Sequence, residues 1–288
     1  MFTYAAPTSV EQVVDALSEW GSRARILAGG QTLIPLIHSG RLNPDHLIDI
    51  NGVRSLDFIH QNGDLSLGAC CRQHDLEAFL HTRKRCALIA EALPLIADRE
   101  IRNRGTVCGS LAAALPGAVL PAVALACNAK MRIQNKDGAR ELCATDFYRD
   151  NGSVALAPDE FLTGVVFPEC DLYRSAIEEV RYTQLSFPAC GAAVLVDSHD
   201  GLCSSVRIAV FGQGFPARRM GQAELLVKGE RLTPQLLDEV AVRIRKQVRA
   251  HSVPGIPEEY ARHVAGSLAA RAFKRAVELS QPLTTQVN

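Results

Sequence analysis

The chain has 288 residues, of which 47% are hydrophobic and 22% are charged, as in soluble globular proteins of one large or two ordinary domains. Its 31 basic residues balance its 31 acidic residues, which excludes the charge footprint of a protein that binds nucleic acid or an acidic membrane. No apolar stretch is long enough for a membrane span, and the N-terminus lacks the features of a signal peptide. We therefore expect a cytoplasmic protein.

A helix and two short strands are predicted in the first part of the chain. Thr8 to Glu11 have the pattern of a capping box, and apolar residues follow at helical spacing as far as Leu17. Apolar runs predict strands at 24–27 and 46–50. Between them lies a glycine-rich segment, so this order predicts a small α/β unit with a glycine loop at its mouth.

A second, antiparallel sheet is predicted from the middle of the chain, together with several helices. The strands are expected at 64–69, 130–134 and 162–167, and the helices at 75–80, 87–96 and 120–127. Four charged residues between 98 and 102 indicate either a solvated helix end or a contact with a partner.

A polar stretch at 168–175 marks the expected domain boundary. The following elements combine hairpin strands with long helices. They are strands at 192–196 and 206–211, a turn at 198–201, and helices at about 234–250 and 258–280. Thr233 followed by Pro234 is a typical start for the first of these helices.

The nine cysteines and eight histidines show neither C-x-x-C nor H-x-x-x-H spacing. Zinc and iron–sulfur patterns are therefore absent from the sequence. In a cytoplasmic chain, scattered cysteines are best interpreted as thiols that pack as small apolar groups. We expect neither a metal site nor disulfides.

Two glycine-bearing segments have the features of phosphate-binding loops. The first is Ala28-Gly29-Gly30-Gln31-Thr32, and the second runs from Gly105 to Ser110 as GTVCGS. Glycine allows positive φ and a close approach of the backbone to a ligand. Backbone N–H groups at 29–32 and 109–110 could then hold a diphosphate without a lysine or arginine. A Gly-Gly pair is also common in tight turns, so neither segment is decisive alone.

Three segments together resemble the FAD-binding medium subunits of molybdenum hydroxylases, which include carbon monoxide dehydrogenases, xanthine dehydrogenases and N-heteroaromatic oxidoreductases. They are AGGQTLIPLI at 28–37, IRNRGTVCGSLAA at 101–113 and LAPDEFLTGVVFP at 156–168. The resemblance implies an α+β fold. A vanillyl-alcohol-oxidase-type FAD-binding domain would occupy 1–172, with subdomains at about 1–58 and 59–172. A C-terminal domain with a small antiparallel sheet and C-terminal helices would occupy 173–288.

The resemblance further implies that FAD is bound non-covalently, because no histidine stands where relatives attach the flavin. Hydroxyl groups of Thr32, Thr106 and Ser110 would add donors for the pyrophosphate or ribityl oxygens. Ile96 and Leu162 would line the flavin ring or the adenine, although simple core positions explain them equally well. No catalytic residue is expected. The full set of implied FAD-binding residues is Leu27, Ala28, Gly29, Gly30, Gln31, Thr32, Leu33, Ile96, Thr106, Gly109, Ser110, Leu162 and Gln184.

The implied role is electron transfer. In the family, a large subunit with a molybdenum cofactor hydroxylates the substrate, and a small subunit with two [2Fe–2S] clusters relays the electrons to FAD. A dimer of such heterotrimers is expected, with an N-heteroaromatic compound or an aldehyde as substrate. The sequence has no separate nucleotide fingerprint for NAD, which favours oxygen or another carrier as the electron acceptor.

Several positions depart from the family pattern. Cys108 replaces a glycine and is either a redox thiol or a spacer in the turn. Leu115 and Val119 replace acidic residues, so Val119 cannot hydrogen-bond the flavin. Gln184 replaces a lysine, and it can donate only a neutral hydrogen bond. These departures motivate an alternative, a structural subunit whose flavin site has decayed and which only holds the complex together. A free-standing flavin oxidase is a third reading, but no substrate base is evident.

Overall fold

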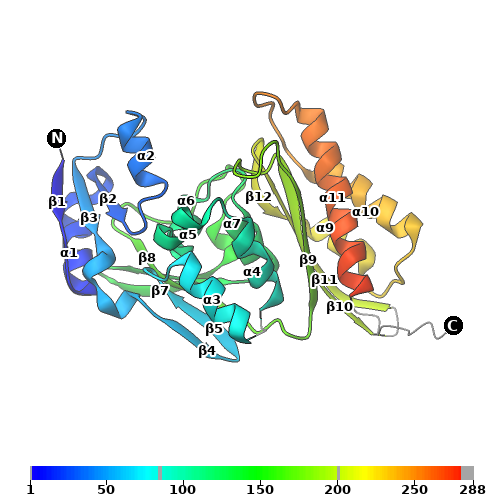
Figure 1. The fold of residues 1–288 in the computed structure, drawn as a ribbon, viewed down its shortest axis with the longest axis horizontal. Helices are drawn as coiled ribbons and strands as arrows, with labels where there is room; N and C mark the ends of the chain where they lie inside the picture. Colours follow the sequence, from blue (N-terminus) through cyan, green and yellow to red (C-terminus); the bar gives the residue numbers. More distant parts are fainter. Residues whose placement is uncertain (1, 84–85, 200–201, 280–288) are drawn as a thin grey trace.

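The computed structural model describes residues 2–83, 86–199 and 202–279. Its first unit, at the N-terminal end in Figure 1, is a three-stranded parallel sheet with the order β1-β3-β2. The strands are β1 (Thr3–Ala5), β2 (Ala24–Leu27) and β3 (His46–Asp49), and the helices are α1 (Val10–Trp20) and α2 (Leu33–His38). The predicted α/β unit is thus present, with the first glycine loop between β2 and α2.

Helix α1 forms where the sequence predicts it, but its cap is shifted by one residue. The Ser9 side chain accepts a hydrogen bond from the Gln12 N–H, and the Gln12 side chain accepts one from the Thr8 N–H at 2.8 Å. The helix buries Val13, Val14 and Leu17. The capping box therefore uses Ser9 and Gln12 in place of the predicted pair Thr8 and Glu11.

The second unit is a five-stranded antiparallel sheet with the order β4-β5-β8-β6-β7. Its strands are β4 (Ile59–Asn62), β5 (Asp64–Gly68), β6 (Lys130–Asn135), β7 (Gly138–Cys143) and β8 (Phe161–Phe167). The helices of this unit are α3 (Gln73–Arg83), α4 (Ala87–Ala92), α5 (Arg99–Arg104), α6 (Val107–Ala113), α7 (Val119–Ala126) and α8 (Ala144–Phe147). Every residue of α7 is buried, so this helix forms the centre of the molecule (Figure 1).

The predicted helix at 87–96 is interrupted. Helix α4 ends at Ala92, and Leu93–Leu95 form a 3₁₀ turn that contains Pro94. Proline lacks the N–H needed to continue an α-helix, which explains the tighter turn. Ala97 then has a φ of +40°, so the chain changes direction before α5.

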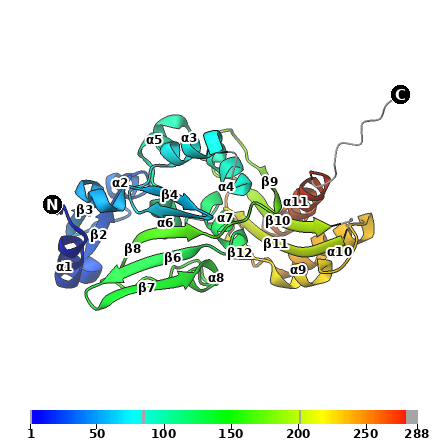
Figure 2. The same cartoon turned by 90° about the horizontal axis from the view of Figure 1, so that it is seen from below.

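The C-terminal unit is a four-stranded antiparallel sheet with the order β12-β11-β10-β9. It contains β9 (Arg174–Val180), β10 (Cys190–His199), β11 (Leu202–Gly212) and β12 (Phe215–Arg219), with α9 (Gly221–Val227), α10 (Pro234–Gln247) and α11 (Glu258–Glu278) on one face (Figures 1 and 2). Strands β10 and β11 pair as the predicted hairpin. Residues 200 and 201 of its predicted turn, and the predicted helix end at 280, lie outside the described residues.

Both faces of the C-terminal sheet are buried. Val194 and Val210 pack in the core formed with α10 and α11, whereas Leu195 and Phe211 belong to the core of the preceding sheet and helices. Two-sided burial explains why these strands are nearly continuous apolar runs. The α+β architecture expected from the sequence is confirmed. In the described part of the chain, no helix has the length and apolar character needed to cross a membrane.

Candidate flavin site

A cavity of about 560 Å³ lies where the three units meet, within the size range of small-molecule sites. All of the predicted FAD-binding residues except Leu27 and Gln184 line it. These are Ala28, Gly29, Gly30, Gln31, Thr32, Leu33, Ile96, Thr106, Gly109, Ser110 and Leu162. The structure thus brings the two glycine segments and the predicted apolar residues to one place.

The two glycine segments are in direct backbone contact. A Cβ atom at Gly29 would lie 2.4 Å from the Arg104 carbonyl oxygen and 2.9 Å from the Thr106 nitrogen. Gly30 is required for a different reason, because its φ is +73°, in the left-handed region that favours glycine. Among the described residues, the N–H groups of residues 29–32 have no acceptor, so this loop can offer them to an anion.

The second glycine segment is not a loop but the start of helix α6. Thr106 is its N-cap, and the Thr106 Oγ1 accepts a hydrogen bond from the Gly109 N–H at 3.1 Å. The Ser110 N–H donates to the Thr106 carbonyl at 3.2 Å. The expected role of these two amides as diphosphate donors is therefore not supported. Within this first helical turn, the backbone N–H of Cys108 has no hydrogen-bond acceptor among the described residues.

Two residues that the sequence did not indicate connect the glycine segments. Asn51 Nδ2 donates to the Ala28 carbonyl at 2.9 Å, and Asn51 Oδ1 accepts from Arg72 Nη2 at 2.5 Å. Arg72 Nη1 donates to the Arg104 carbonyl at 2.5 Å, and the backbone of Arg72 also forms a β-bridge with Thr106. Asn51 and Arg72 thus form a polar bridge from one segment to the other.

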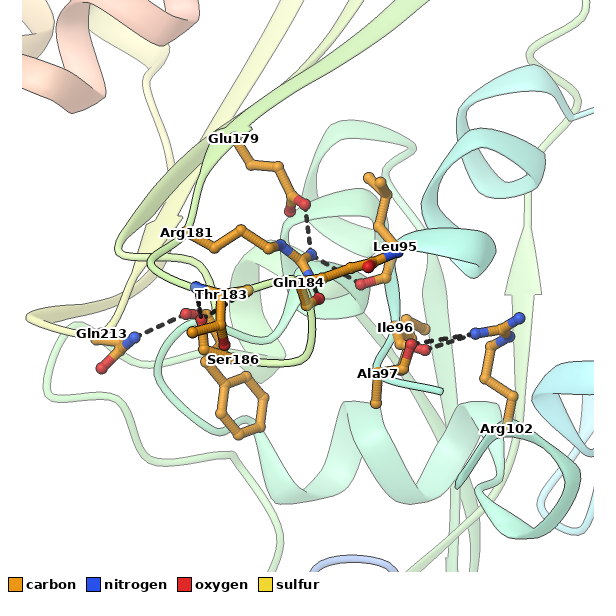
Figure 3. A network of polar contacts seen from close by, with 11 residues as sticks. Leu95, Ile96, Ala97, Arg102, Glu179, Arg181, Thr183, Gln184, Ser186 and Gln213 are labelled. Atoms are coloured by element: carbon orange, nitrogen blue, oxygen red, sulfur yellow. Dashed lines mark hydrogen bonds and ion pairs between the residues drawn. The ribbon is translucent and has the colours of Figure 1, made fainter. Parts of the chain in front are cut away.

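The opposite end of the cavity is held by two arginines (Figure 3). Arg181 Nη2 donates to the Leu95 carbonyl at 2.8 Å, and Arg102 Nη1 donates to the Ile96 carbonyl at 2.9 Å. Arg181 is also ion-paired with Glu179, and Arg102 with Glu77 at 3.0 Å. The turn that carries Ile96 is therefore fixed from both sides, by one arginine of α5 and one that follows β9.

The two predicted residues outside the cavity wall have other roles. Leu27 packs beneath the glycine loop, where its Cδ1 lies 3.3 Å from the Cβ position of Gly30. Gln184 is exposed, and its carbonyl oxygen accepts a hydrogen bond from Arg181 Nη1 at 2.9 Å. Arg181, three residues earlier, lines the cavity. The cation at this end therefore comes from Arg181, and Gln184 stands where relatives often carry a lysine.

Cys108 is 2% exposed, and its thiol donates to the Gly68 carbonyl at 3.6 Å. Burial raises the pKa of this thiol well above its ordinary value, so the reactive thiolate is disfavoured. This supports the spacer interpretation over the redox thiol. Leu115 and Val119 line the cavity and make its wall apolar at positions where the family pattern has acidic residues.

The residues present fit a dinucleotide cofactor. The glycine loop offers amides with no acceptor among the described residues, and the rest of the wall is mainly apolar. Gln73 also lines the cavity, and its Oε1 is buried with no partner in the described part of the structure. A buried polar atom of this kind requires a hydrogen-bond donor, which a ligand can supply. The glycine loop and the apolar wall thus define a site, at the junction of the three units, that suits a nucleotide cofactor.

Comparisons with known proteins identify the family. Residues 1–170 match the FAD-binding domain in molybdopterin dehydrogenase, and residues 175–276 match the C-terminal domain of the carbon monoxide dehydrogenase flavoprotein. The medium chain of carbon monoxide dehydrogenase from Afipia carboxidovorans is 30% identical, with 96% of each chain covered. Caffeine dehydrogenase subunit beta from Pseudomonas sp. (strain CBB1) is also 30% identical, with 96% of this chain and 95% of the relative covered.

Comparison with solved structures identifies the same family. A structure of carbon monoxide dehydrogenase from Hydrogenophaga pseudoflava has a TM-score of 0.92 and 29% identity, covering 96% of this chain and 97% of the other. The chain belongs to the FAD-binding medium subunits of molybdenum hydroxylases. It is an oxidoreductase subunit, and its cofactor is FAD.

Proposed function

We propose that this chain is the electron-transfer subunit of its complex and that it passes electrons from a partner's [2Fe–2S] clusters through FAD to an external acceptor. Bound FAD supplies the redox chemistry by taking up and releasing electrons. The protein supplies its position, its electrostatic environment and its shielding from water. The observation that carries the proposal is a cofactor cavity of about 560 Å³ in which the described lining residues include no free acid–base group.

The charged side chains in the cavity wall are already occupied. Glu160 is paired with Arg140 at 2.6 Å, Arg181 is paired with Glu179, and Arg25 donates to the Ser22 and Ala24 carbonyls. Among the described residues that line the cavity, there is no histidine or tyrosine. General acid–base chemistry needs a free group of suitable pKa, so a free-standing oxidase is disfavoured and non-covalent FAD is favoured.

In the proposed arrangement, the diphosphate of FAD binds the amides at 29–32, and the flavin ring lies toward Ile96 and Arg181. The glycine loop suits an anion because its amides are unpaired and its backbone is accessible. The end at Ile96 suits an apolar ring because Leu95 and Phe187 also line it. The intact cavity argues against the alternative of a decayed site that serves only as a scaffold.

The proposed partners are a large subunit with the molybdenum cofactor and a small [2Fe–2S] subunit, in a cytoplasmic dimer of heterotrimers. No group of residues that could hold a metal ion is present in the described ranges. Tyr182, Leu185 and Phe187 are 59%, 62% and 49% exposed on the loop at the cavity mouth. Exposed apolar side chains at such a place suit a protein contact.

The proposed substrate is an N-heteroaromatic compound or an aldehyde, bound on the large subunit. The similarity to a caffeine dehydrogenase subunit supports the first class. We propose oxygen or another carrier as the acceptor, because the sequence carries no separate NAD fingerprint.

Arg181→Gln is expected to lower the two-electron midpoint potential of bound FAD by about 30 mV. A cation near the ring stabilises the reduced, anionic form, and about 1.4 kcal/mol corresponds to 30 mV for two electrons. Glu179→Gln should shift the potential upward, because it leaves Arg181 unneutralised. Arg102→Gln is the matched control: it loses a similar bond to the same turn but does not line the cavity. Spectroelectrochemical titration measures the flavin midpoint potential of all three variants. Equal potentials in Arg181→Gln and the wild type would contradict the placement of the flavin ring near Arg181.

The electron-transfer role is tested by rapid mixing of the assembled complex with its substrate under anaerobic conditions. We expect the visible flavin absorbance to bleach in the complex and to remain unchanged in the isolated chain. Bleaching of the isolated chain by substrate would contradict the proposed role, since the chain would then oxidise substrate itself.

A further inference from the structure

Three cysteines surround a small cavity between the helices of the second unit and the C-terminal sheet. Cys86 precedes α4, Cys127 ends α7, and Cys170 lies in the segment between β8 and β9. All three line one cavity of about 10 Å³, together with Tyr173 and Leu195. The cavity is too small for a cofactor, and the cysteines are far apart in sequence. The three cysteines are therefore brought together by the fold and not by a local sequence motif.

The Cys170 sulfur faces both a cation and a second thiol. Arg207 Nη1 lies 3.9 Å from the Cys170 Sγ, the Cys170 thiol donates to the Pro168 carbonyl at 3.1 Å, and Cys127 lines the same cavity. The Arg207 guanidinium is fixed by Tyr173, whose ring centroid is 4.5 Å from the guanidinium carbon and whose hydroxyl accepts from Nη2 at 3.0 Å. A cation held beside the sulfur stabilises the thiolate relative to the thiol.

The two thiols of the pair have opposite properties. The neighbouring Cys127 thiol and the charge of Arg207 lower the pKa of Cys170 to about 7, although burial opposes this shift. The neighbouring Cys170 and burial raise the pKa of Cys127 well above its ordinary value. Cys170 is partly exposed and Cys127 is buried. An accessible thiolate beside a protonated thiol is the arrangement of redox-sensing cysteine pairs.

We propose that Cys170 and Cys127 form a peroxide-sensitive thiol pair that closes to a disulfide on oxidation. The Cys170 thiolate attacks hydrogen peroxide, the O–O bond breaks, and Cys170 sulfenic acid and hydroxide are formed. The Cys127 sulfur then attacks the Cys170 sulfur, the S–O bond breaks, and water leaves with the thiol proton. In total, two thiols lose two electrons and peroxide is reduced to water. The disulfide would tie the end of α7 to the segment that leads into the C-terminal sheet.

The test is oxidation of the reduced, purified full-length chain with a few equivalents of hydrogen peroxide, followed by alkylation, tryptic digestion and mass spectrometry. Trypsin places Cys170 in the peptide 150–174 and Cys127 in 105–130. We expect these two peptides to become cross-linked, with fragmentation assigning the bond to Cys127 and not to Cys108. Thioredoxin or dithiothreitol should reverse the cross-link.

Cys143 is the internal control, because it is exposed and lies in its own peptide, 141–149. We expect Cys170 to be oxidised faster than Cys143 despite its lower exposure, because the Arg207 guanidinium beside its sulfur stabilises the thiolate that attacks peroxide.

Two variants separate the parts of the pair. Cys127→Ser should leave Cys170 as a sulfenic acid that dimedone captures, and Arg207→Gln should remove the advantage of Cys170 over Cys143. Oxidation of Cys143 before Cys170 in the wild-type chain would overturn the proposal. So would oxidation of Cys170 without a cross-link to Cys127. Neither outcome depends on flavin content, so the test is independent of the proposed electron-transfer function.

Discussion

Replacing Gly29 with alanine is expected to raise the dissociation constant for FAD about 5- to 150-fold. The new Cβ would lie 2.4 Å from the Arg104 carbonyl oxygen, 2.8 Å from the Gly105 Cα and 2.9 Å from the Thr106 nitrogen. All three are backbone atoms, so no side chain can rotate away. The two segments must separate, and overpacking of this kind costs about 1–3 kcal/mol. Equilibrium titration of the apoprotein with FAD measures the effect.

Gly221→Ala is the matched control. A Cβ at Gly221 meets nothing within 4 Å, and neither Gly29 nor Gly221 has a positive φ. The two substitutions therefore add the same methyl group and differ in the space around it. Thermal unfolding of both variants separates lost binding from lost folding. FAD affinity in Gly29→Ala equal to that of Gly221→Ala would show that contact between the two segments does not shape the site.

Arg72→Ala is expected to weaken FAD binding about 10- to 150-fold. Arg72 donates to the Arg104 carbonyl and to Asn51 Oδ1, and through Asn51 it reaches the Ala28 carbonyl. A hydrogen bond from a charged group contributes about 1.5–3 kcal/mol. Without the guanidinium, the second glycine segment loses its polar connection to the first. Arg99→Ala is the control, because Arg99 is exposed at the start of α5 and its substitution by alanine removes the same charge.

A double-mutant cycle shows whether Asn51 and Arg72 act as one bridge. Residues of one hydrogen-bond network have non-additive effects. We therefore expect Asn51→Ala to weaken FAD binding in the wild type and to add little in the Arg72→Ala background. Full additivity would mean that each side chain supports its own segment and that no bridge exists.

The sequence predicts most of the elements whose signal is local. Helix α10 starts at Pro234 with Thr233 as its cap, as the sequence indicates. Strand β8 was expected from its apolar run and lies at the centre of its sheet. Helix α2 was not predicted, because the Pro35 within it disguises the helical pattern. Strand β9 at 174–180 was not predicted, because Glu178 and Glu179 lack strand propensity. In the structure these two side chains form ion pairs with arginines of α11 and of the cavity wall.

The candidate site likewise contains residues that the sequence indicates and residues whose roles only the structure reveals. Gly29 and Gly30 are recognisable because a local backbone requirement selects glycine. The residues that hold the site in shape are not recognisable: Asn51, Arg72 and Arg181 act on carbonyl groups 23 to 86 positions away in the sequence. Nothing in their own neighbourhoods indicates this, because the partners are backbone atoms of any residue type. Their roles emerge only from the arrangement of the three units.

The most direct test of the account is the flavin content of the purified chain. We expect a visible flavin spectrum, about one FAD per chain, and release of all the FAD into the supernatant on denaturation, because no lining histidine or tyrosine among the described residues is available for a covalent bond. A chain that stays colourless after incubation with FAD, and when purified with its partner subunits, would contradict the assignment of the cavity to FAD.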